Sequence, residues 1–503
     1  MKKRAATKAL FTLVTMAAGT IAGLEIGPTT AQSLPGDEPL HGAYNLPPDN
    51  VPRQQRYQDK GAPAQKPGSR ERRLAHRPAS SPARNNFDPE PYAPPQKAHN
   101  LEPLPQTVAP PPLPPQSVLA IEEDEVIERG PGYRAGAFVL RPSLSEDIGW
   151  DSNPRHLPDG QARSSAVVRT QASLSARSDW SSSSLKIDLR GSYSAFSDNQ
   201  ESSRRSGSAR ATLHVDVTSD TAYNVEAHTG LSTLRAGTPE SNGSVVGTNV
   251  FKYGGSVGGT RRFGKFALSL TGLANHTHYE DGVNANGDIV ALSNSDVTTY
   301  GLKSRATYHS TPFFNPFIEA SVSANRRDLQ LDSSGYNRDS NGYYARLGDG
   351  FRLSDTLRGE VAAGYVHRQY VDGRLVPISG ISATGILRWQ ATPLTKITMR
   401  GSAERGETTT TGASSVLTRK AQIDVSHALT HDVKITGSAR YVTTSYDGIT
   451  LNQDQWRGRL GAEYSLSRSV LLRGSYAYSV LRSSTPTSNY SASTFLVGVK
   501  LTP

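Results

Sequence analysis

The 503-residue chain contains no cysteine. This absence excludes disulfide bonds and thiolate metal sites from every part of the sequence. Only 35% of the residues are hydrophobic, and beyond the N-terminus no apolar run reaches the roughly 20 residues that a membrane helix needs. If the mature chain enters a membrane, we expect it to do so as strands.

The N-terminus has the parts of a secretory signal. Residues 2–4 are basic, residues 9–22 are apolar, and Thr29 and Ala31 are the small residues of a cleavage site. A membrane anchor, the alternative, would need a longer apolar run. We therefore predict a signal peptide over residues 1–31.

The next segment, residues 32–130, contains 20 of the 32 prolines, few aliphatic side chains and no periodic pattern. Such a segment buries too little apolar surface to offset its chain entropy, so we predict a disordered periplasmic leader. It contains a basic cluster at 66–77, and on compositional grounds we favour a solvated tether over a specific binding motif.

From Gly136 to the C-terminus, apolar and polar residues alternate with a period of two. In the stretch 185–195, Leu185, Ile187 and Leu189 share one face, and the residues between them share the other. A helix would need a period of 3.6 residues, which fits none of these stretches. The region is predicted to consist of strands.

Polar connections divide this region at a steady spacing. Eight are short, at 177–183, 218–221, 262–265, 310–316, 353–356, 391–394, 429–432 and 465–469. Nine are mostly longer and rich in Asn, Asp and Gly, at 151–161, 197–203, 236–247, 281–295, 332–340, 371–374, 408–415, 446–450 and 483–488. Seventeen connections separate eighteen strands, and short turns at one rim with long loops at the other are typical of outer-membrane barrels.

The fold class predicted is all-β: a closed antiparallel transmembrane β-barrel of about 18 strands over residues 136–503. A soluble sandwich or propeller would bury its apolar face, but here that face is thin and rich in Gly and Ala. Lipid needs no tight interdigitation with the apolar face, and closure removes unpaired strand edges. No long inward loop is obvious, so residues 101–135 are the candidate plug.

The polar face of the strands is strongly basic. The chain carries a net charge of +10, and the charges of the signal and leader largely cancel. The basic residues predicted to face the lumen are Arg169, Lys186, Arg190, Arg210, Lys303, Arg305, Arg346, Arg358, Arg388, Lys396, Arg400, Lys420, Lys434, Arg440, Arg457, Arg459 and Arg473. The acids predicted there are fewer: Asp188, Asp216, Glu226, Glu319, Glu360, Asp424 and Glu463.

A lumen lined with cations concentrates anions. We therefore predict a porin-like channel for anionic solutes or exported surface polysaccharide. Two alternatives remain open: the charges pair across strands and only hold the barrel's shape, or the barrel does not conduct and serves as a surface anchor or assembly partner through its leader. Loop Arg and Lys residues would in either case bind lipopolysaccharide.

Signatures of enzyme chemistry are weak. His276, His278 and Glu280 are in phase on one strand, but two histidines and one acid imply no complete metal site. The Gly-x-Ser-x-Gly match at 254–258 falls inside a predicted strand, where glycines more plausibly permit curvature or close packing than a catalytic elbow. No phosphate-binding glycine loop occurs. We predict no catalytic residue, metal, cofactor or nucleic-acid partner.

The first strand and its loop, "GAFVLRPSLSEDIGWDSNP" (136–154), and hairpins ending in phrases such as "LLRGSYAYS" carry a resemblance. The chain resembles the putative beta-barrel porin 2 family over residues 136–503, although its last strand lacks the common final aromatic residue. The resemblance implies a Gram-negative outer-membrane protein inserted by the assembly machinery. It also implies a role with exopolysaccharide and its export components.

Overall fold

The computed structural model describes residues 132–502, except 198–202, 235–246, 285, 333–334, 411 and 486–487. The predicted signal peptide and leader lie outside the described residues, and so does most of the candidate plug. No helix in this described part is long and apolar enough to cross a membrane.

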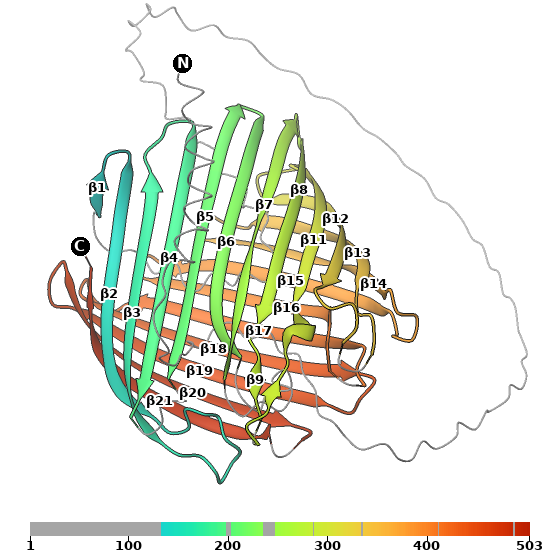
Figure 1. Cartoon of the computed structure of the whole chain (residues 1–503). Coiled ribbons are helices and arrows are strands. Elements are labelled where there is room, and N and C mark those ends of the chain that lie inside the picture. Colours follow the sequence, from blue (N-terminus) through green and yellow to red (C-terminus); the bar gives the residue numbers. More distant parts are fainter. Residues whose placement is uncertain are drawn as a thin grey trace, which may run out of the picture. The chain divides into compact units, whose positions relative to one another are not determined.

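Eighteen long antiparallel strands form one sheet (Figure 1). The strands are β2 (Phe138–Asp151), β3 (Ser165–Ser178), β4 (Ser183–Phe196), β5 (Arg204–Thr218), β6 (Thr221–Leu234), β7 (Thr248–Phe263), β8 (Phe266–Tyr279), β11 (Val297–Tyr308), β12 (Phe314–Arg327), β13 (Ser340–Arg352), β14 (Leu357–Tyr370), β15 (Ile378–Thr392), β16 (Thr395–Glu407), β17 (Ser415–Ala428), β18 (Val433–Asp447), β19 (Asn452–Ser465), β20 (Val470–Ser483) and β21 (Tyr490–Leu501).

The sheet closes on itself between its first and last long strands. β2 pairs with β21 in a register that runs from Leu144 opposite Leu501 to Asp151 opposite Thr494. Every one of the eighteen strands is therefore hydrogen-bonded on both sides, and no edge is left unpaired. This confirms the predicted closed barrel and its strand number.

The connections follow the predicted asymmetry. One rim has tight turns such as 219–220 and 264–265, where Gly264 adopts a φ of 60° that favours glycine. The other rim has long loops such as 152–164 and 280–296. The alternation of short and long connections keeps all long loops on one side of the barrel.

Several small elements were not predicted. A three-residue strand, β1 (Tyr133–Ala135), precedes the expected start of the barrel and pairs along β2. Within the 280–296 loop lie the hairpin β9 (Gly282–Val283) and β10 (Ile289–Val290) and a 3₁₀ turn, Ser293–Ser295. These pieces are too short for a periodic pattern to reveal them.

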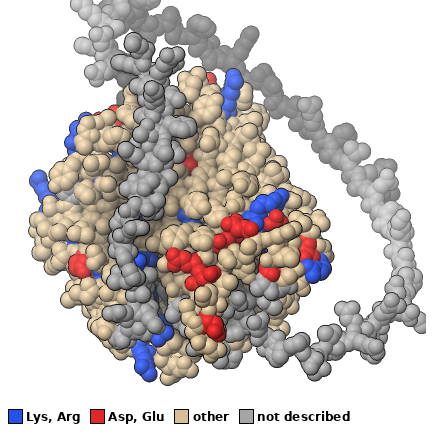
Figure 2. All heavy atoms as spheres, viewed as in Figure 1, with Lys and Arg blue, Asp and Glu red and all other residues tan. Residues whose placement is uncertain are grey.

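The apolar side chains of the wall are exposed rather than buried in a core. On β12, Ile318 and Val322 are 53% and 58% exposed, whereas the alternate residue Glu319 is 2% exposed. In the view of Figure 2 most of the described surface is neither basic nor acidic. Such a face suits contact with lipid. Small apolar clusters occur instead at the long-loop rim, for example Val416 with Tyr446 and Leu451.

Candidate functional site

The inner face of the barrel is defined by side chains that reach across strands. Arg305 on β11 donates two hydrogen bonds to Glu360 on β14, at 3.0 and 2.8 Å, over the intervening strands β12 and β13. Such a reach is possible on the concave side of a curved sheet. All 24 charged residues predicted to face the lumen occupy strand positions that alternate with the exposed apolar face. Their role in lining a water-filled lumen stays a prediction.

The first region of the inner face is the paired wall, which we define as Lys303, Arg305, Glu319, Arg346 and Glu360 on β11–β14. The Glu319 side chain, 3% exposed, accepts hydrogen bonds from Arg346 at 2.6 and 2.9 Å and from the Tyr344 hydroxyl at 3.0 Å. Arg305 also lies 3.8 Å from Glu319. In this wall each carboxylate is held by at least one arginine.

An aromatic ring supports the paired wall. The Arg305 guanidinium lies 3.4 Å from the centroid of the Phe317 ring, a cation–π contact. The ring needs the space left by Gly348, where an added Cβ would come within 2.3 Å of Phe317 Cζ. The glycine thus leaves the space that the Phe317 ring occupies in contact with Arg305.

The second region is the basic wall on β15–β19, which holds eight of the predicted basic residues and only two of the predicted acids. The basic residues are Arg388, Lys396, Arg400, Lys420, Lys434, Arg440, Arg457 and Arg459, and the acids are Asp424 and Glu463. The register places Arg400, Gln422, Arg440 and Arg457 side by side on four consecutive strands. A row of this kind carries a local excess of positive charge.

Polar contacts order this row. Arg400 donates to Asp424 at 2.5 Å, Gln422 donates to the same carboxylate at 2.9 Å, and Arg440 donates to Gln422 at 3.1 Å. Glu404, which the sequence analysis missed, interacts electrostatically with Lys420 and Arg346. It was missed although it is in phase with Lys396 and Arg400 on the same strand.

The seam where the barrel closes is also polar. Arg473 on β20 lies 2.9 Å from the Asp147 carboxylate, as an ion pair without hydrogen-bond geometry, and donates to Gln171 at 2.7 Å. Arg169 interacts electrostatically with Asp147 and Arg459. These contacts connect β20 to β2 and β3 and link four consecutive strands.

Among the other predicted residues, the contacts are local. Lys186 lies 3.0 Å from Asp188 on the same strand, and Arg210 lies 3.8 Å from Glu226 on the next one. Asp216 contacts His214 at 3.0 Å. Arg190 and Arg358 belong to the same inner face of the barrel.

The Asp-Ser-Asn sequence at the end of β2 closes the first long loop. The Asn153 backbone N–H donates to Asp151 at 2.9 Å, and the Asn153 side chain bonds both the N–H and the C=O of Leu157, each at 2.9 Å. Thr494 on β21 donates to Asp151 at 2.9 Å. The residues that carry the family resemblance therefore hold the loop onto the closing strand.

One connection of the long-loop rim is bonded to residues beyond its neighbouring strand. In the β16–β17 connection (408–414), the carbonyl oxygen of Thr408 accepts a hydrogen bond from Arg338 at 2.6 Å. That of Ser414 accepts one from the Tyr370 hydroxyl at 2.6 Å. Arg338 precedes β13 and Tyr370 ends β14, so strand β15 lies between both donors and β16 in the sheet. The sequence pattern could not show this, because local alternation carries no information on contacts between distant segments.

The histidines on β8 are not assembled into a metal site. His278 contacts Asp296 at 2.6 Å and His276 contacts Thr298 at 2.8 Å, while Glu280 accepts a hydrogen bond from Asn249. Across the described ranges, no three His, Asp or Glu side chains converge on a position that would hold a metal ion.

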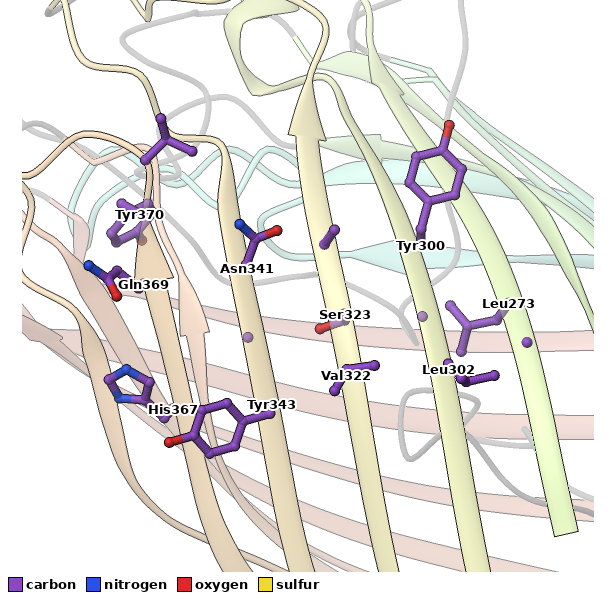
Figure 3. Close-up of a pocket in the computed structure, with 15 residues that line it drawn as sticks. Leu273, Tyr300, Leu302, Val322, Ser323, Asn341, Tyr343, His367, Gln369 and Tyr370 are labelled. Carbon is purple, nitrogen blue, oxygen red and sulfur yellow. The ribbon is translucent and has the colours of Figure 1, made fainter.

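A shallow hollow of about 900 Å³ lies over β8 and β11–β14 (Figure 3). Its lining includes Tyr300, Leu302, Val322 and Tyr343, which are 47–58% exposed and belong to the apolar outer face. The hollow is thus on the lipid side of the wall and is not part of the charged inner face.

The closed barrel with exposed apolar outer face and charged inner face defines a porin-like outer-membrane β-barrel. The chain belongs to the putative beta-barrel porin 2 family, whose model matches residues 130–502. No curated protein matches the chain.

Solved structures with a similar fold include the copper transporter OprC, with 10% identity and a TM-score of 0.41, covering 74% of this chain and 81% of that one. OccK2 (OpdF) of Pseudomonas aeruginosa has 11% identity and a TM-score of 0.38, covering 72% and 98%. OccAB2 of Acinetobacter baumannii has 13% identity and a TM-score of 0.38, covering 72% and 97%.

Proposed function

We propose that the protein is an outer-membrane channel whose basic wall favours anions, either small anionic solutes or an anionic surface polysaccharide on its way out. The observation that supports this most is the row that Arg400, Arg440 and Arg457 form with Gln422 on four consecutive strands. Cationic linings between low-dielectric walls raise the local concentration of anions. On this proposal the protein is a transporter and not an enzyme.

The partners we propose follow from the same surfaces. The exposed apolar face would contact lipid, and basic side chains at the long-loop rim would contact lipopolysaccharide. Polysaccharide-export components would meet the barrel from the periplasm, where the leader also lies on this proposal. Insertion would depend on the outer-membrane assembly machinery.

Single-channel recording of the purified full-length protein in a planar bilayer, under a KCl gradient, tests the proposal. We expect stable conductance with a reversal potential that favours chloride. The double substitution Arg440→Glu and Arg457→Glu should lower the chloride preference at least fivefold, since each unit charge several ångströms from a passing ion in water contributes about 0.5–1 kcal/mol and fivefold corresponds to about 1 kcal/mol.

The matched control is Arg155→Glu, the same charge reversal on an exposed residue of the first long loop. It should leave the reversal potential almost unchanged. Absence of conductance from folded protein would reject the channel and favour the anchor hypothesis. A cation preference in the wild-type protein would reject the role of the basic wall.

A further inference from the structure

A carboxylate at the end of β16 meets two arginines from distant strands. Glu407 accepts a hydrogen bond from Arg327 on β12 at 3.0 Å and lies 3.2 Å from an Arg368 nitrogen on β14. All three side chains are nearly buried, at 7%, 9% and 15% exposure. Because β13–β15 separate β12 from β16, this ion pair reaches across the interior of the barrel at the long-loop rim.

Two neutral donors complete the arrangement. Asn325 donates to Glu407 at 2.8 Å, and the Ser340 hydroxyl donates to the same oxygen. Arg368 in turn donates to Ser340 at 2.7 Å. Two guanidinium groups and two neutral donors around one carboxylate are the chemistry with which proteins recognise carboxylates in general.

Arg327 retains a donor that Glu407 does not use. Its Nη1 donates to the Ser295 carbonyl oxygen at 2.8 Å, but its Nε is buried and has no hydrogen-bond partner in the described part of the chain. Buried donors are satisfied in nearly all native structures. The unused donor is therefore available to a further acceptor atom.

The position of Glu407 is coupled to the connection that follows it. Arg338 holds the Thr408 carbonyl oxygen, and Thr409 Oγ1 lies 3.3 Å from Ser295 Oγ in the loop before β11. When Glu407 leaves the arginines, the residues after it must shift with it. The carboxylate is thus tethered to a segment at the mouth of the barrel.

We propose that Arg327, Arg368, Asn325 and Ser340 form a binding site for the carboxylate of an anionic solute, and that Glu407 fills this site until the solute displaces it. The ligand class is a sugar acid or another carboxylate-bearing solute. The proposal rests on the proposed function for the route by which such an anion reaches the site. Glu407 is an internal competitor for the site. The apparent affinity for the solute is therefore the intrinsic affinity multiplied by the fraction of molecules in which Glu407 has left the site.

Isothermal titration of the folded full-length protein with galacturonate tests the site, with galactose as the uncharged probe. If the site is vacant in about a tenth of wild-type molecules or fewer, Glu407→Gln should bind galacturonate about tenfold more tightly or better. Adding Arg327→Gln should abolish the gain. Glu280→Gln, an acid-to-amide change at the same rim, should bind like the wild type.

Equal affinity of the wild type and Glu407→Gln, or binding of galactose as strong as that of galacturonate, would overturn the proposal. Titration does not need ion flow, so a barrel that binds galacturonate without conducting contradicts the proposed channel and leaves the site standing. A conducting barrel without this binding contradicts the site alone.

A second variant decides the matter if Glu407→Gln does not fold. The chain has no native cysteine, so Ser295→Cys with Thr409→Cys can place one disulfide where the two hydroxyls are 3.3 Å apart. The oxidised form holds the connection beside Glu407 and should bind galacturonate more weakly than the reduced form. Equal binding in both forms would contradict the displacement of Glu407.

Discussion

The paired wall and the basic wall occupy the same inner face and are built from the same residue types. They differ in how many carboxylates they contain relative to their basic side chains. In the paired wall, Glu319 and Glu360 are each clasped by arginines. In the basic wall, Asp424 holds Arg400, and the row continues through Gln422 to Arg440 and Arg457. We expect the paired wall to stabilise the barrel and, on the proposed function, the basic wall to set its electrostatic field.

The largest effect should come from breaking the paired wall. Glu319→Ala leaves Arg346 without its buried carboxylate, and removing one partner of a buried ion pair costs about 3–5 kcal/mol. Urea unfolding in detergent micelles measures the loss. Asp424→Ala, whose carboxylate is more exposed at 18%, should cost less. Equal losses in the two variants would remove the distinction between the walls.

A glycine tests the packing beneath the paired wall. Gly348→Ala would place a Cβ 2.3 Å from Phe317 Cζ and 2.5 Å from the Val361 carbonyl oxygen, and overpacking of this kind costs about 1–3 kcal/mol. At Gly191 an added Cβ has no atom within 4 Å. Gly191→Ala should therefore unfold at the same urea concentration as the wild type, whereas Gly348→Ala should unfold earlier.

Neutralising an acid in the basic wall should change the ion selectivity of the channel. Glu404→Gln in the basic wall removes a negative charge near Lys420, so the preference for chloride should rise about twofold, a change of a few tenths of a kcal/mol. Ser402→Ala, on the same face of the same strand, is the uncharged control. Reversal potentials measure the change, and a shift toward potassium in Glu404→Gln would contradict the account.

The smallest effect should come from a loop outside both walls. In the β14–β15 connection (371–377), the Arg374 side chain donates to Asp372 and holds the pKa of that carboxyl well below its usual range. A depressed folded-state pKa gives stability that is present above the unfolded pKa of about 3.9 and lost as the pH falls through the folded pKa.

Arg374→Ala should therefore return the pKa of Asp372 toward its usual value in an NMR titration. Barrel stability at neutral pH should stay the same, because Arg374 is 62% exposed and water screens the pair. A large loss of stability at pH 7 would show that this loop ion pair supports the wall.

The sequence predicted the features that depend on the period of the apolar pattern and on the turn residues that interrupt it. Two-residue alternation around Leu189 or Ile318, and the tight turns with Gly264, predicted the strands, their number and the long-loop rim, because each is a local signal. The inner-face positions of residues such as Arg440 follow from the same alternation. The even number of strands allows the antiparallel closing pair β2–β21 that the structure shows.

Contacts between distant strands could not be predicted in this way. The bond of Arg305 to Glu360 and the reach of Glu407 to Arg327 depend on the curvature of the closed sheet, which no local pattern encodes. Arg327, Arg368 and Glu407 lie at strand ends, where alternation weakens, and so they were missed as functional candidates. Glu404 was missed although its phase with Arg400 was a sufficient signal.

The most direct test of the account is the reversal potential of the wild-type protein in KCl gradients at low and high mean salt. Fixed cations on the inner face predict a preference for chloride at about 0.1 M salt, which weakens toward 1 M as the screening length falls from about 10 to 3 Å. A preference for potassium, or a chloride preference that does not change with salt, would contradict a lumen governed by the basic wall.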